Sequence, residues 1–319
     1  MSIYKKLLIL AAVACILLLA GCGDNTVPED TTPPPATTPD IPVGVVNDVV
    51  PGRFAVKDNK IYYALSDSIL CYDETVSLVV TADEPSYLCL VGDILYFRCV
   101  SKRENYKPAE YQIRSVDLTN GSVAIYANGN INCLLTAQSK VFYLEDHSSL
   151  YKIENTSTQD ILSGELSDPY AANGAIYLGI DGNLCRFDPS GEQYSVLIDK
   201  CYPNNISADE QTVYYSTEEN SALSSYGIES GTVVQSSINN YGLVLDGGVH
   251  YYVVNNDGFA LIRATDKHVV LELGRLQNCS SPLFYKGNIY FFISSDDYYG
   301  LISCDPLTGE MTRLTESEG

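Results

Sequence analysis

The stretch "ANGAIYLGIDGNLCRFDPSGEQYSVLID", residues 172–199, holds three short apolar segments separated by turn signals. The first segment follows Asn173-Gly174, a pair that tolerates positive φ and is typical of a tight hairpin turn. The second, "LCRFD" (184–188), places two apolar residues three positions apart and ends on an acid. The turn Asp188-Pro-Ser-Gly191 and the alternating segment "QYSVLI" (193–198) follow. This order predicts antiparallel strands joined in sequence.

The same phrase recurs about every forty residues, a period typical of β-propellers. Its Tyr-rich strand is found as "KIYYA" (60–64), "ILYFR" (94–98), "KVFYL" (140–144), "AIYLG" (175–179), "TVYYS" (212–216), "VHYYV" (249–253) and "NIYFF" (288–292). A second pattern, apolar-x-x-apolar-acid, follows most copies, and a further alternating segment lies on each side of the pair. Each unit is therefore predicted to contain four short strands.

We predict an all-β protein, a β-propeller of four-stranded blades over residues 51–319. No unit can bury both faces alone, whereas sheets packed around an axis can. Seven copies of the phrase predict seven blades, with six as the alternative. A pair of β-sandwiches would not need a recurring phrase, and a solenoid keeps a stricter period. The Tyr side chains are expected to pack one blade on the next, and residues 43–50 ("VGVVNDVV") are a candidate closing strand.

The "IYY"-type strands, followed by "LYKIE" (150–154) and "LCRFD" (184–188), resemble the DUF5050 group of bacterial propellers. That group is similar in pattern to the YWTD propellers of lipoprotein receptors, although Trp is absent from this chain. The resemblance implies an extracytoplasmic binding or scaffolding module. It brings no shared catalytic residues.

The first residues predict export and lipid attachment. Lys5 and Lys6 precede an apolar run from Leu7 to Ala20, which is shorter than the about twenty residues of a membrane-spanning helix and is typical of an export signal. The ending "LAGC" (19–22) resembles the lipobox of bacterial lipoproteins. That resemblance implies cleavage between Gly21 and Cys22, lipidation of Cys22, and a place on the extracytoplasmic face of the cell membrane. The alternative is an ordinary secretory signal with a chance cysteine.

Residues 22–50 are predicted to be the lipidated cysteine and an extended tether. The segment is rich in Pro and Thr and poor in large apolar side chains, a composition that does not fold by itself. The chain has 40 acidic residues against 19 Lys and Arg, so its charge excludes nucleic acid as a favoured partner. The same charge repels anionic lipid headgroups.

The sequence contains no catalytic motif, and no catalytic residue, metal ligand set or cofactor site is predicted. The three histidines, His147, His250 and His268, fall in different units. Acidic residues stand in the loops that follow the Tyr strands: Asp67, Asp146, Asp181, Glu218, Glu219, Asp257, Asp296 and Asp297. They form either an acidic rim that attracts cations or ordinary turn residues of an acidic protein, and the second interpretation is preferred.

Eight cysteines fall within the predicted propeller: Cys71, Cys89, Cys99, Cys133, Cys185, Cys201, Cys279 and Cys304. An even number in an exported protein favours disulfides. Most of them stand inside apolar strand patterns, where Cys acts as a small buried hydrophobe. We expect mostly buried thiols and leave one or two cross-strand disulfides open.

The second unit departs from the others through a longer loop, "SKRENYKPAEY" (101–111). It gathers Lys102, Arg103 and Lys107 around Tyr106 in a chain poor in cations. Long loops on rigid scaffolds often carry function, so these four residues are the candidate partner contact. The alternative is an insertion whose cations pair with neighbouring acids.

These observations favour a lipid-anchored, extracytoplasmic binding or scaffolding protein whose partner is another envelope or surface protein. Two alternatives stay open: a sensor or capture module for a small polar ligand, and a propeller hydrolase or lyase acting at the central face. A capture module would have a deep central pocket, and a scaffold a wide flat face.

Overall fold

The computed structural model divides the chain into two units, Met1–Pro42 and Val43–Gly319. It describes residues 52–104, 108–217, 219–239, 243–246, 249–254, 259–263, 269–273, 278–279, 283–294 and 299–315. All of these belong to the second unit. The predicted signal, the lipid attachment site, the tether and the candidate closing strand at 43–50 lie outside the described residues. None of the described residues belongs to a helix long and apolar enough to cross a bilayer.

Strands and turns make up the described residues, and the strands form antiparallel sheets. The first sheet contains β1 (Phe54–Lys57), β2 (Lys60–Ala64), β3 (Ser68–Asp73) and β4 (Thr75–Thr81). The second contains β5 (Ser86–Val91), β6 (Ile94–Lys102), β7 (Glu110–Asp117) and β8 (Val123–Gly129). The third contains β9 (Ile131–Ala137), β10 (Lys140–Glu145), β11 (Ser149–Glu154) and β12 (Ser157–Ser163). The fourth contains β13 (Leu166–Ala172), β14 (Ala175–Ile180), β15 (Asn183–Asp188) and β16 (Gln193–Ile198).

The later sheets repeat this arrangement. The fifth contains β17 (Pro203–Ala208), β18 (Thr212–Thr217), β19 (Asn220–Gly227) and β20 (Val233–Asn239). The next contains β21 (Leu243–Asp246), β22 (Val249–Val254), β23 (Phe259–Arg263) and β24 (Val269–Leu273). The last contains β25 (Asn278–Cys279), β26 (Leu283–Tyr285), β27 (Asn288–Ser294), β28 (Tyr299–Cys304) and β29 (Met311–Arg313).

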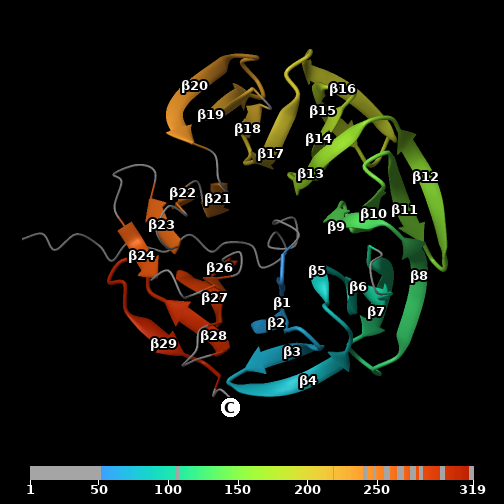
Figure 1. The fold of residues 1–319 in the computed structure, drawn as a ribbon, viewed down its shortest axis with the longest axis vertical. Coiled ribbons are helices and arrows are strands. Elements are labelled where there is room, and N and C mark those ends of the chain that lie inside the picture. The colour runs from blue at the N-terminus through green and yellow to red at the C-terminus, as the bar shows by residue number, and fades with distance from the viewer. Residues whose placement is uncertain are drawn as a thin grey trace, which may run out of the picture. The chain divides into compact units, whose positions relative to one another are not determined.

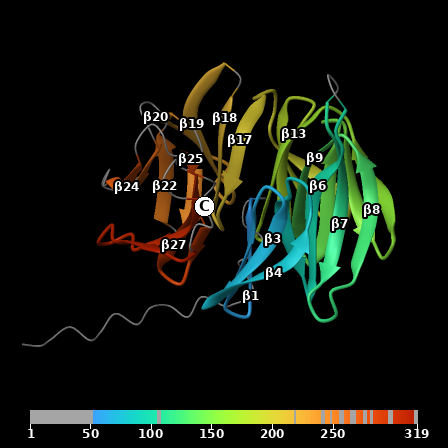
Figure 2. The ribbon, with the colours of Figure 1, turned by 60° about the horizontal axis from the view of Figure 1, so that its bottom comes forward.

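The sheets lie in a ring with the first strand of each at the centre and the last at the outside (Figure 1). Within each sheet the strands are neighbours in sequence order, apart from β25 and β26, which both pair with β27. In the view tilted by 60°, the strands of each sheet run between the two faces of the ring (Figure 2). This arrangement confirms the all-β propeller of four-stranded blades. The count of seven blades stays a prediction, because the last two sheets are described only in part.

The burial of each strand follows its place in the ring. All six residues of β14 are buried, since this strand has its own sheet on both edges and neighbouring sheets over both faces. The outer strand of the same sheet, β16, is exposed along its first four residues. The Tyr-rich segments are the second strands, β2, β6, β10, β14, β18, β22 and β27. Their near-continuous apolar character therefore reflects burial on both faces.

Tyr side chains fill the space between neighbouring sheets, as the sequence predicts. Tyr177 of the fourth sheet and Tyr215 of the fifth belong to one buried cluster with Leu184 and Val213. Tyr177 is 2% exposed. Phe142 and Phe187 meet edge to face across the third and fourth sheets, with ring centroids 6.1 Å apart, a favoured aromatic geometry.

The turns between the first and second strands use residues in the left-handed region. Asp58 and Asn59 have φ of 50° and 67°, and Gln138 and Ser139 have φ of 51° and 57°. Positive φ at both central residues defines the turn that matches the twist of a two-stranded ribbon. The turn predicted from sequence at Asn173-Gly174 has the same conformation, with φ of 52° and 70°, whereas Gln138-Ser139 is an unusual pair that sequence alone does not reveal as such a turn.

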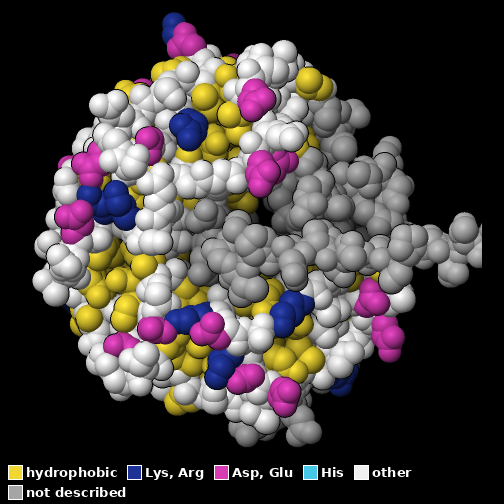
Figure 3. Space-filling model, turned by 180° about the vertical axis from the view of Figure 1, so that it is seen from behind, with side chains coloured by type: hydrophobic (Ala, Val, Ile, Leu, Met, Phe, Trp, Pro, Cys, Tyr) yellow, Lys and Arg dark blue, Asp and Glu magenta, His cyan; other side chains and the backbone are white. Residues whose placement is uncertain are grey.

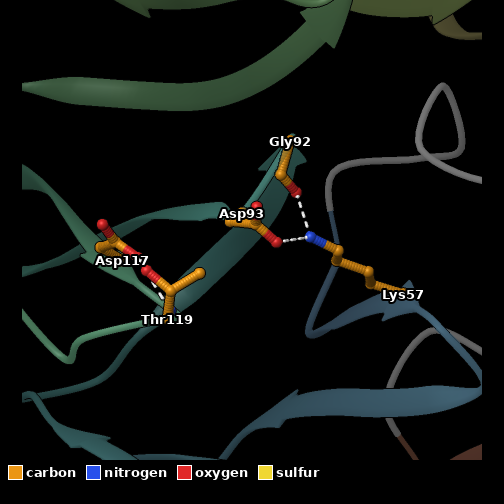
Figure 4. Close-up of polar contacts among 5 residues, drawn as sticks. All are labelled: Lys57, Gly92, Asp93, Asp117 and Thr119. Atoms are coloured by element: carbon orange, nitrogen blue, oxygen red, sulfur yellow. Dashed lines mark hydrogen bonds and ion pairs between the residues drawn. The ribbon is translucent and has the colours of Figure 1, made fainter.

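Polar contacts tie neighbouring sheets together at this turn end. The Lys57 ammonium donates to the carbonyl of Gly92 at 2.8 Å and forms an ion pair with Asp93 (Figure 4). Between the third and fourth sheets, Lys140 donates to the carbonyl of Pro189 at 2.7 Å. Lys152, with its side chain 6% exposed, forms ion pairs with Glu154 of its own sheet at 2.7 Å and with Glu192 of the next.

The first and last sheets meet through an apolar cluster. Phe54, Val56 and Tyr63 of the first sheet pack with Leu283 and Leu301 of the last. The hydroxyl of Tyr285 donates to Asn59 Oδ1 at 3.1 Å across the same junction. Among the described residues each of these sheets is built from one continuous segment, so the described contacts across this junction are made by side chains.

Candidate functional site

The candidate contact loop joins β6 to β7. It lies on the face of the ring opposite to the tight turns between first and second strands. Lys102 forms an ion pair with Glu104 inside the loop. Arg103 Nη2 lies 2.8 Å from Glu84 Oε2, on the segment that follows the first sheet. The hydrogen bond from Arg103 to this carboxylate raises the pKa of the guanidinium. Both cations are therefore paired with acids and still more than half exposed, at 58% and 57%.

Tyr106 and Lys107, the other two residues of the predicted contact, lie outside the described residues. The described stems of the loop are joined by hydrogen bonds. Ser101 Oγ donates to the carbonyl of Glu110 at 3.0 Å, and Val100 N donates to the carbonyl of Asp83 at 2.8 Å. The two stems of the loop are therefore joined to each other and to the segment that follows the first sheet.

Arg98 of β6 supports this base, a role that the sequence analysis did not identify. Its guanidinium carbon lies 4.5 Å from the ring centroid of Tyr87 and 4.3 Å from that of Tyr111, within reach of a cation–π interaction. Nη1 donates to the carbonyls of Ile131 and Asn132 at 2.9 and 3.1 Å, and Nε donates to the hydroxyl of Ser86 at 3.1 Å.

The Arg98 guanidinium thus joins the second sheet to the first strand of the third. Tyr87 has φ of 54°, and the pairing of β5 with β6 shifts register between Ser86 and Cys89. A bulge of this kind redirects a side chain, and here it accompanies the placement of the Tyr87 ring against Arg98. The signal in the sequence was a single cation inside the apolar strand "ILYFR", which is too common a pattern to predict such a contact.

Acidic residues of the loops after the second strands have structural partners. Asp67 accepts from the hydroxyl of Ser68 at 3.0 Å, Asp146 accepts from Asn130 Nδ2 at 2.8 Å, and Asp181 accepts from the backbone N–H of Glu165 at 3.0 Å. Glu219 is exposed. The remaining members of this set, Glu218, Asp257, Asp296 and Asp297, lie outside the described residues. The three bonded acids therefore agree with the preferred interpretation as turn residues.

The acids in the turns between third and fourth strands, on the opposite face of the ring, bind backbone N–H groups. Asp117 Oδ1 accepts from the hydroxyl of Thr119 at 2.6 Å (Figure 4) and from its backbone N–H at 2.8 Å. Asp188 and Asp305 accept in the same way from Ser190 and Leu307, at 2.9 and 2.7 Å. These hydrogen bonds lower the pKa of all three carboxyl groups. Each acid therefore fixes the turn between a third and a fourth strand.

The histidines are not gathered into a site by the described part of the chain. The backbone N–H of His147, in the turn between β10 and β11, donates to Asn132 Oδ1 at 2.8 Å. His250 belongs to β22, and His268 lies outside the described residues. Within the described ranges, no group of three His, Cys, Asp or Glu side chains has the geometry to hold a metal ion.

The thiols lie mostly in the core. Cys71, Cys89, Cys99, Cys185 and Cys304 are buried as thiols, and Cys201 is half-buried. Burial raises the pKa of Cys185 to about 11, with a smaller contribution from the charge of Cys201. At neutral pH this thiol is protonated and unreactive. The state of these six agrees with the expectation of buried thiols.

Opposite charges are mixed on the face of the ring turned away from the viewer in Figure 1. Figure 3 shows that face, where most Lys and Arg side chains lie near Asp or Glu, with hydrophobic side chains exposed between them. The described part of this face therefore presents no continuous patch of one sign.

Solved structures similar to this chain support the fold. The β-propeller domain of the trilobed protease from Pyrococcus furiosus, which has an open velcro topology, matches with a TM-score of 0.59 at 13% identity, over 85% of this chain and 97% of its own. The computationally designed Ika8 protein matches with a TM-score of 0.56 at 12% identity, over 82% of this chain and 86% of its own. The AfRom2 CNH domain matches with a TM-score of 0.51 at 12% identity, over 79% and 91%.

At these identities the likeness establishes the β-propeller fold and nothing about function. No family model matches the chain, and no curated protein matches it. The resemblance to the DUF5050 group therefore stays a prediction.

Proposed function

We propose that this propeller is a lipid-anchored, extracytoplasmic scaffold that presents the loop at 101–111 to another envelope or surface protein. The observation that carries the proposal is the rigid support of this loop. Arg98 is held between two Tyr rings and three hydrogen-bond acceptors directly below it. A loop whose stem is held by hydrogen bonds and carries exposed cations loses less conformational entropy when a partner binds.

The charge of the loop favours a partner with acidic or mixed charge. Lys102 and Arg103 are exposed cations in a chain whose formal net charge is −21. Their ion pairs with Glu104 and Glu84 are exposed, and exposed pairs contribute little energy. An incoming carboxylate can therefore compete for either cation, and Tyr106 and Lys107 extend the same proposed contact.

Membrane attachment in this proposal rests on the "LAGC" sequence alone. Cleavage after Gly21 and acylation of Cys22 would leave the propeller on the tether of residues 22–50. We expect the intact protein to sediment with membranes and its Cys22→Ser variant to be released. Mass spectrometry of the N-terminal peptide would show diacylglycerol on Cys22. A mature N-terminus at another residue would contradict the anchor.

The partner is tested by crosslinking on intact cells, followed by capture of the protein and mass spectrometry. The wild-type chain is compared with a variant in which residues 101–111 are shortened to a tight turn. The proposal expects one dominant envelope protein that is lost with the loop. An Arg103→Glu variant keeps the loop length and should weaken the same capture. If all three proteins capture the same partner equally, the loop is not the contact site. If none of them captures a specific protein, the scaffold function is contradicted.

A further inference from the structure

The chain concentrates its oxidisable side chains in tyrosine. It contains 25 Tyr, two Met and no Trp, and the thiols in the described part of the chain lie mostly in the core. Oxidation of Cys depends on thiolate character and exposure, so buried thiols are poor targets. A one-electron oxidant that meets this protein therefore has Tyr as its main target, and Tyr rings in contact with each other decide what is formed.

Two Tyr of the second sheet make such a contact near the surface. Tyr96 belongs to β6 and Tyr126 to β8, and both side chains are half-buried. Their ring centroids lie 5.4 Å apart, with an angle of 44° between the ring planes, which is typical of an aromatic pair. Both belong to the cluster of side chains between the second and third sheets. The two rings are therefore in contact with each other and partly accessible to solvent.

A bulge in β8 brings Tyr126 to this position. The pairing of β7 with β8 skips one residue of β8, and that residue is Tyr126. A bulge of this kind redirects a side chain. The hydroxyl of Tyr126 lies 3.2 Å from Ser115 Oγ on the intervening strand β7. Tyr126 thus reaches across one strand toward Tyr96.

The hydroxyl ends of the two rings are close together. Burial, and after it the neighbouring Tyr126 hydroxyl, raise the pKa of Tyr96 to about 12. The effect of Tyr126 on this pKa requires the two hydroxyl groups to be near each other, so the ring carbons beside them are near as well. In a phenoxyl radical these carbons carry much of the unpaired spin, and two Tyr radicals couple through them.

We propose that Tyr96 and Tyr126 are a site of oxidative crosslinking, at which a carbon–carbon bond joins the two rings. The oxidant is hydrogen peroxide, activated by a haem peroxidase. Each phenol loses one electron and one proton, and the two radicals couple at the carbons beside the hydroxyl groups. The hydrogens on the coupled carbons move to the oxygens, which restores both phenols. Peroxide takes up the two electrons and two protons and becomes two molecules of water.

The bond would join the second and fourth strands of the sheet that carries the candidate contact loop. It would close a covalent ring running from Tyr96 through residues 101–111 to Tyr126. A crosslink of this span restricts the unfolded chain, as a disulfide does. Oxidation would therefore make this sheet harder to unfold. The inference does not depend on the proposed scaffold function.

A stacked Tyr pair in the third sheet provides a contrast. Tyr143 of β10 and Tyr151 of β11 are direct cross-strand partners, with centroids 4.9 Å apart and ring planes 15° apart. Tyr143 is only 3% exposed. Joining these rings would require them to turn edge to edge, which a close-packed interior resists. Tyr126 lies on β8 at the outside of the ring (Figure 1), where such a turn costs less.

A further tilted pair, Tyr285 and Tyr290 of the last sheet, is less suited to coupling. Its ring centroids lie 6.4 Å apart. The hydroxyl of Tyr285 donates to Asn59 Oδ1 of the first sheet, which holds this ring in place. Contact distance and freedom to turn therefore both favour Tyr96 and Tyr126.

The test treats the whole protein with hydrogen peroxide and a haem peptide that acts as a small peroxidase. Dityrosine fluorescence measures the yield in the monomer after size separation. Mass spectrometry of the digested monomer identifies the joined peptides, whose mass is that of the two peptides less two hydrogens. We expect one main crosslink, between Tyr96 and Tyr126. The unfolding midpoint of the crosslinked monomer should rise by about 5 °C.

Matched Tyr→Phe variants locate the site, because a Phe ring forms no phenoxyl radical. We expect Tyr96→Phe and Tyr126→Phe to lose both the crosslink and the rise in the midpoint, whereas Tyr151→Phe keeps both. Each untreated variant is the reference for its own midpoint. Absence of the crosslink, a main product at another Tyr pair, or equal yields from Tyr126→Phe and Tyr151→Phe would overturn the inference. Dityrosine confined to covalent dimers would also overturn it, since coupling would then occur between molecules.

Discussion

Two junctions of the ring are closed by different means. Between the third and fourth sheets, an apolar cluster is reinforced by Lys152, Lys140 and Gln138, which reach across to the next sheet. Between the first and last sheets the described contacts are an apolar cluster and the hydrogen bond from Tyr285 to Asn59. The third and fourth sheets are also adjacent in the chain, whereas the first and last are not. Within the part of the chain that the structure describes, the contacts at the seam of the ring are therefore mainly apolar.

The largest change in stability is expected when one buried leucine is truncated at each junction. Leu301→Ala at the seam and Leu178→Ala at the interior junction each empty a fully buried site. Each should lower the free energy of unfolding by about 3 kcal/mol, in the range of 2–5 kcal/mol for such cavities. Only Leu301→Ala should also increase local opening of the first sheet. Its amides in β1 and β2 should exchange faster than the loss of global stability alone explains. Chemical denaturation and hydrogen exchange measure the two quantities. Equal local opening in both variants would show that chain adjacency does not matter.

Lys152→Met should break the polar reinforcement of the interior junction. The substitution keeps the aliphatic stem and removes the buried ammonium that holds Glu192. We expect a loss of about 2 kcal/mol, since hydrogen bonds to charged groups contribute roughly 1.5–3 kcal/mol. The hydrogen bonds to Glu154 and Glu192 raise the pKa of Lys152 above its ordinary 10.5.

A group with a raised pKa contributes stability that is full below its unfolded pKa and is lost as the pH rises through its folded pKa. The difference between wild type and Lys152→Met should therefore be constant near neutrality and shrink above about pH 10.5. Urea titrations across this range measure it. A difference that stays constant to high pH would mean that the packing of the Met side chain, and not the lost charge, carries the effect.

Tyr285→Phe removes the polar contact at the seam. One neutral hydrogen bond contributes about 1 kcal/mol, so the variant should be less destabilised than Lys152→Met. Tyr194→Phe, on the exposed outer strand β16, is a matched control and should leave the unfolding midpoint unchanged. If Tyr285→Phe costs as much as Leu301→Ala, the seam is held by its hydrogen bond and the comparison is wrong.

The smallest change in stability is expected for a substitution of Asp188, whose turn lies beside the junction between the third and fourth sheets. Its hydrogen bonds from Ser190 lower its pKa below 3.8. Such a carboxyl contributes stability that is present above its unfolded pKa and lost as the pH falls through the folded value. The wild-type advantage over Asp188→Asn should therefore be complete above about pH 4 and shrink as the pH falls below that value. Unfolding midpoints measured along this pH range test it. An advantage that does not change with pH would assign the effect to geometry rather than charge.

The repeat allowed most of the fold to be predicted. The Tyr-rich strands, the turn at Asp188, and the packing of Tyr177 against the next sheet all depend on local pattern, which the sequence displays directly. The junctions could not be predicted in the same way. Lys152 reaches Glu192, and Tyr285 reaches Asn59, across distances in the chain that no periodicity encodes.

The candidate site was only partly accessible to sequence reasoning. The length and charge of the loop at 101–111 identified Lys102 and Arg103, because they interrupt an acidic, regular pattern. The support beneath them was missed. The position of the Arg98 guanidinium depends on a bulge that redirects Tyr87 and on two carbonyls from another sheet. Neither feature can be recognised from the local sequence.

The continuous sheets at the seam have a consequence for how such a chain changes through gene duplication. Where two ends of a chain share one blade, adding or deleting a unit must preserve that shared sheet. Here each described sheet is formed by one continuous stretch of the chain. A whole repeat of about forty residues could therefore be copied or lost without dividing any of the described sheets, provided that the apolar faces of the new neighbours still match.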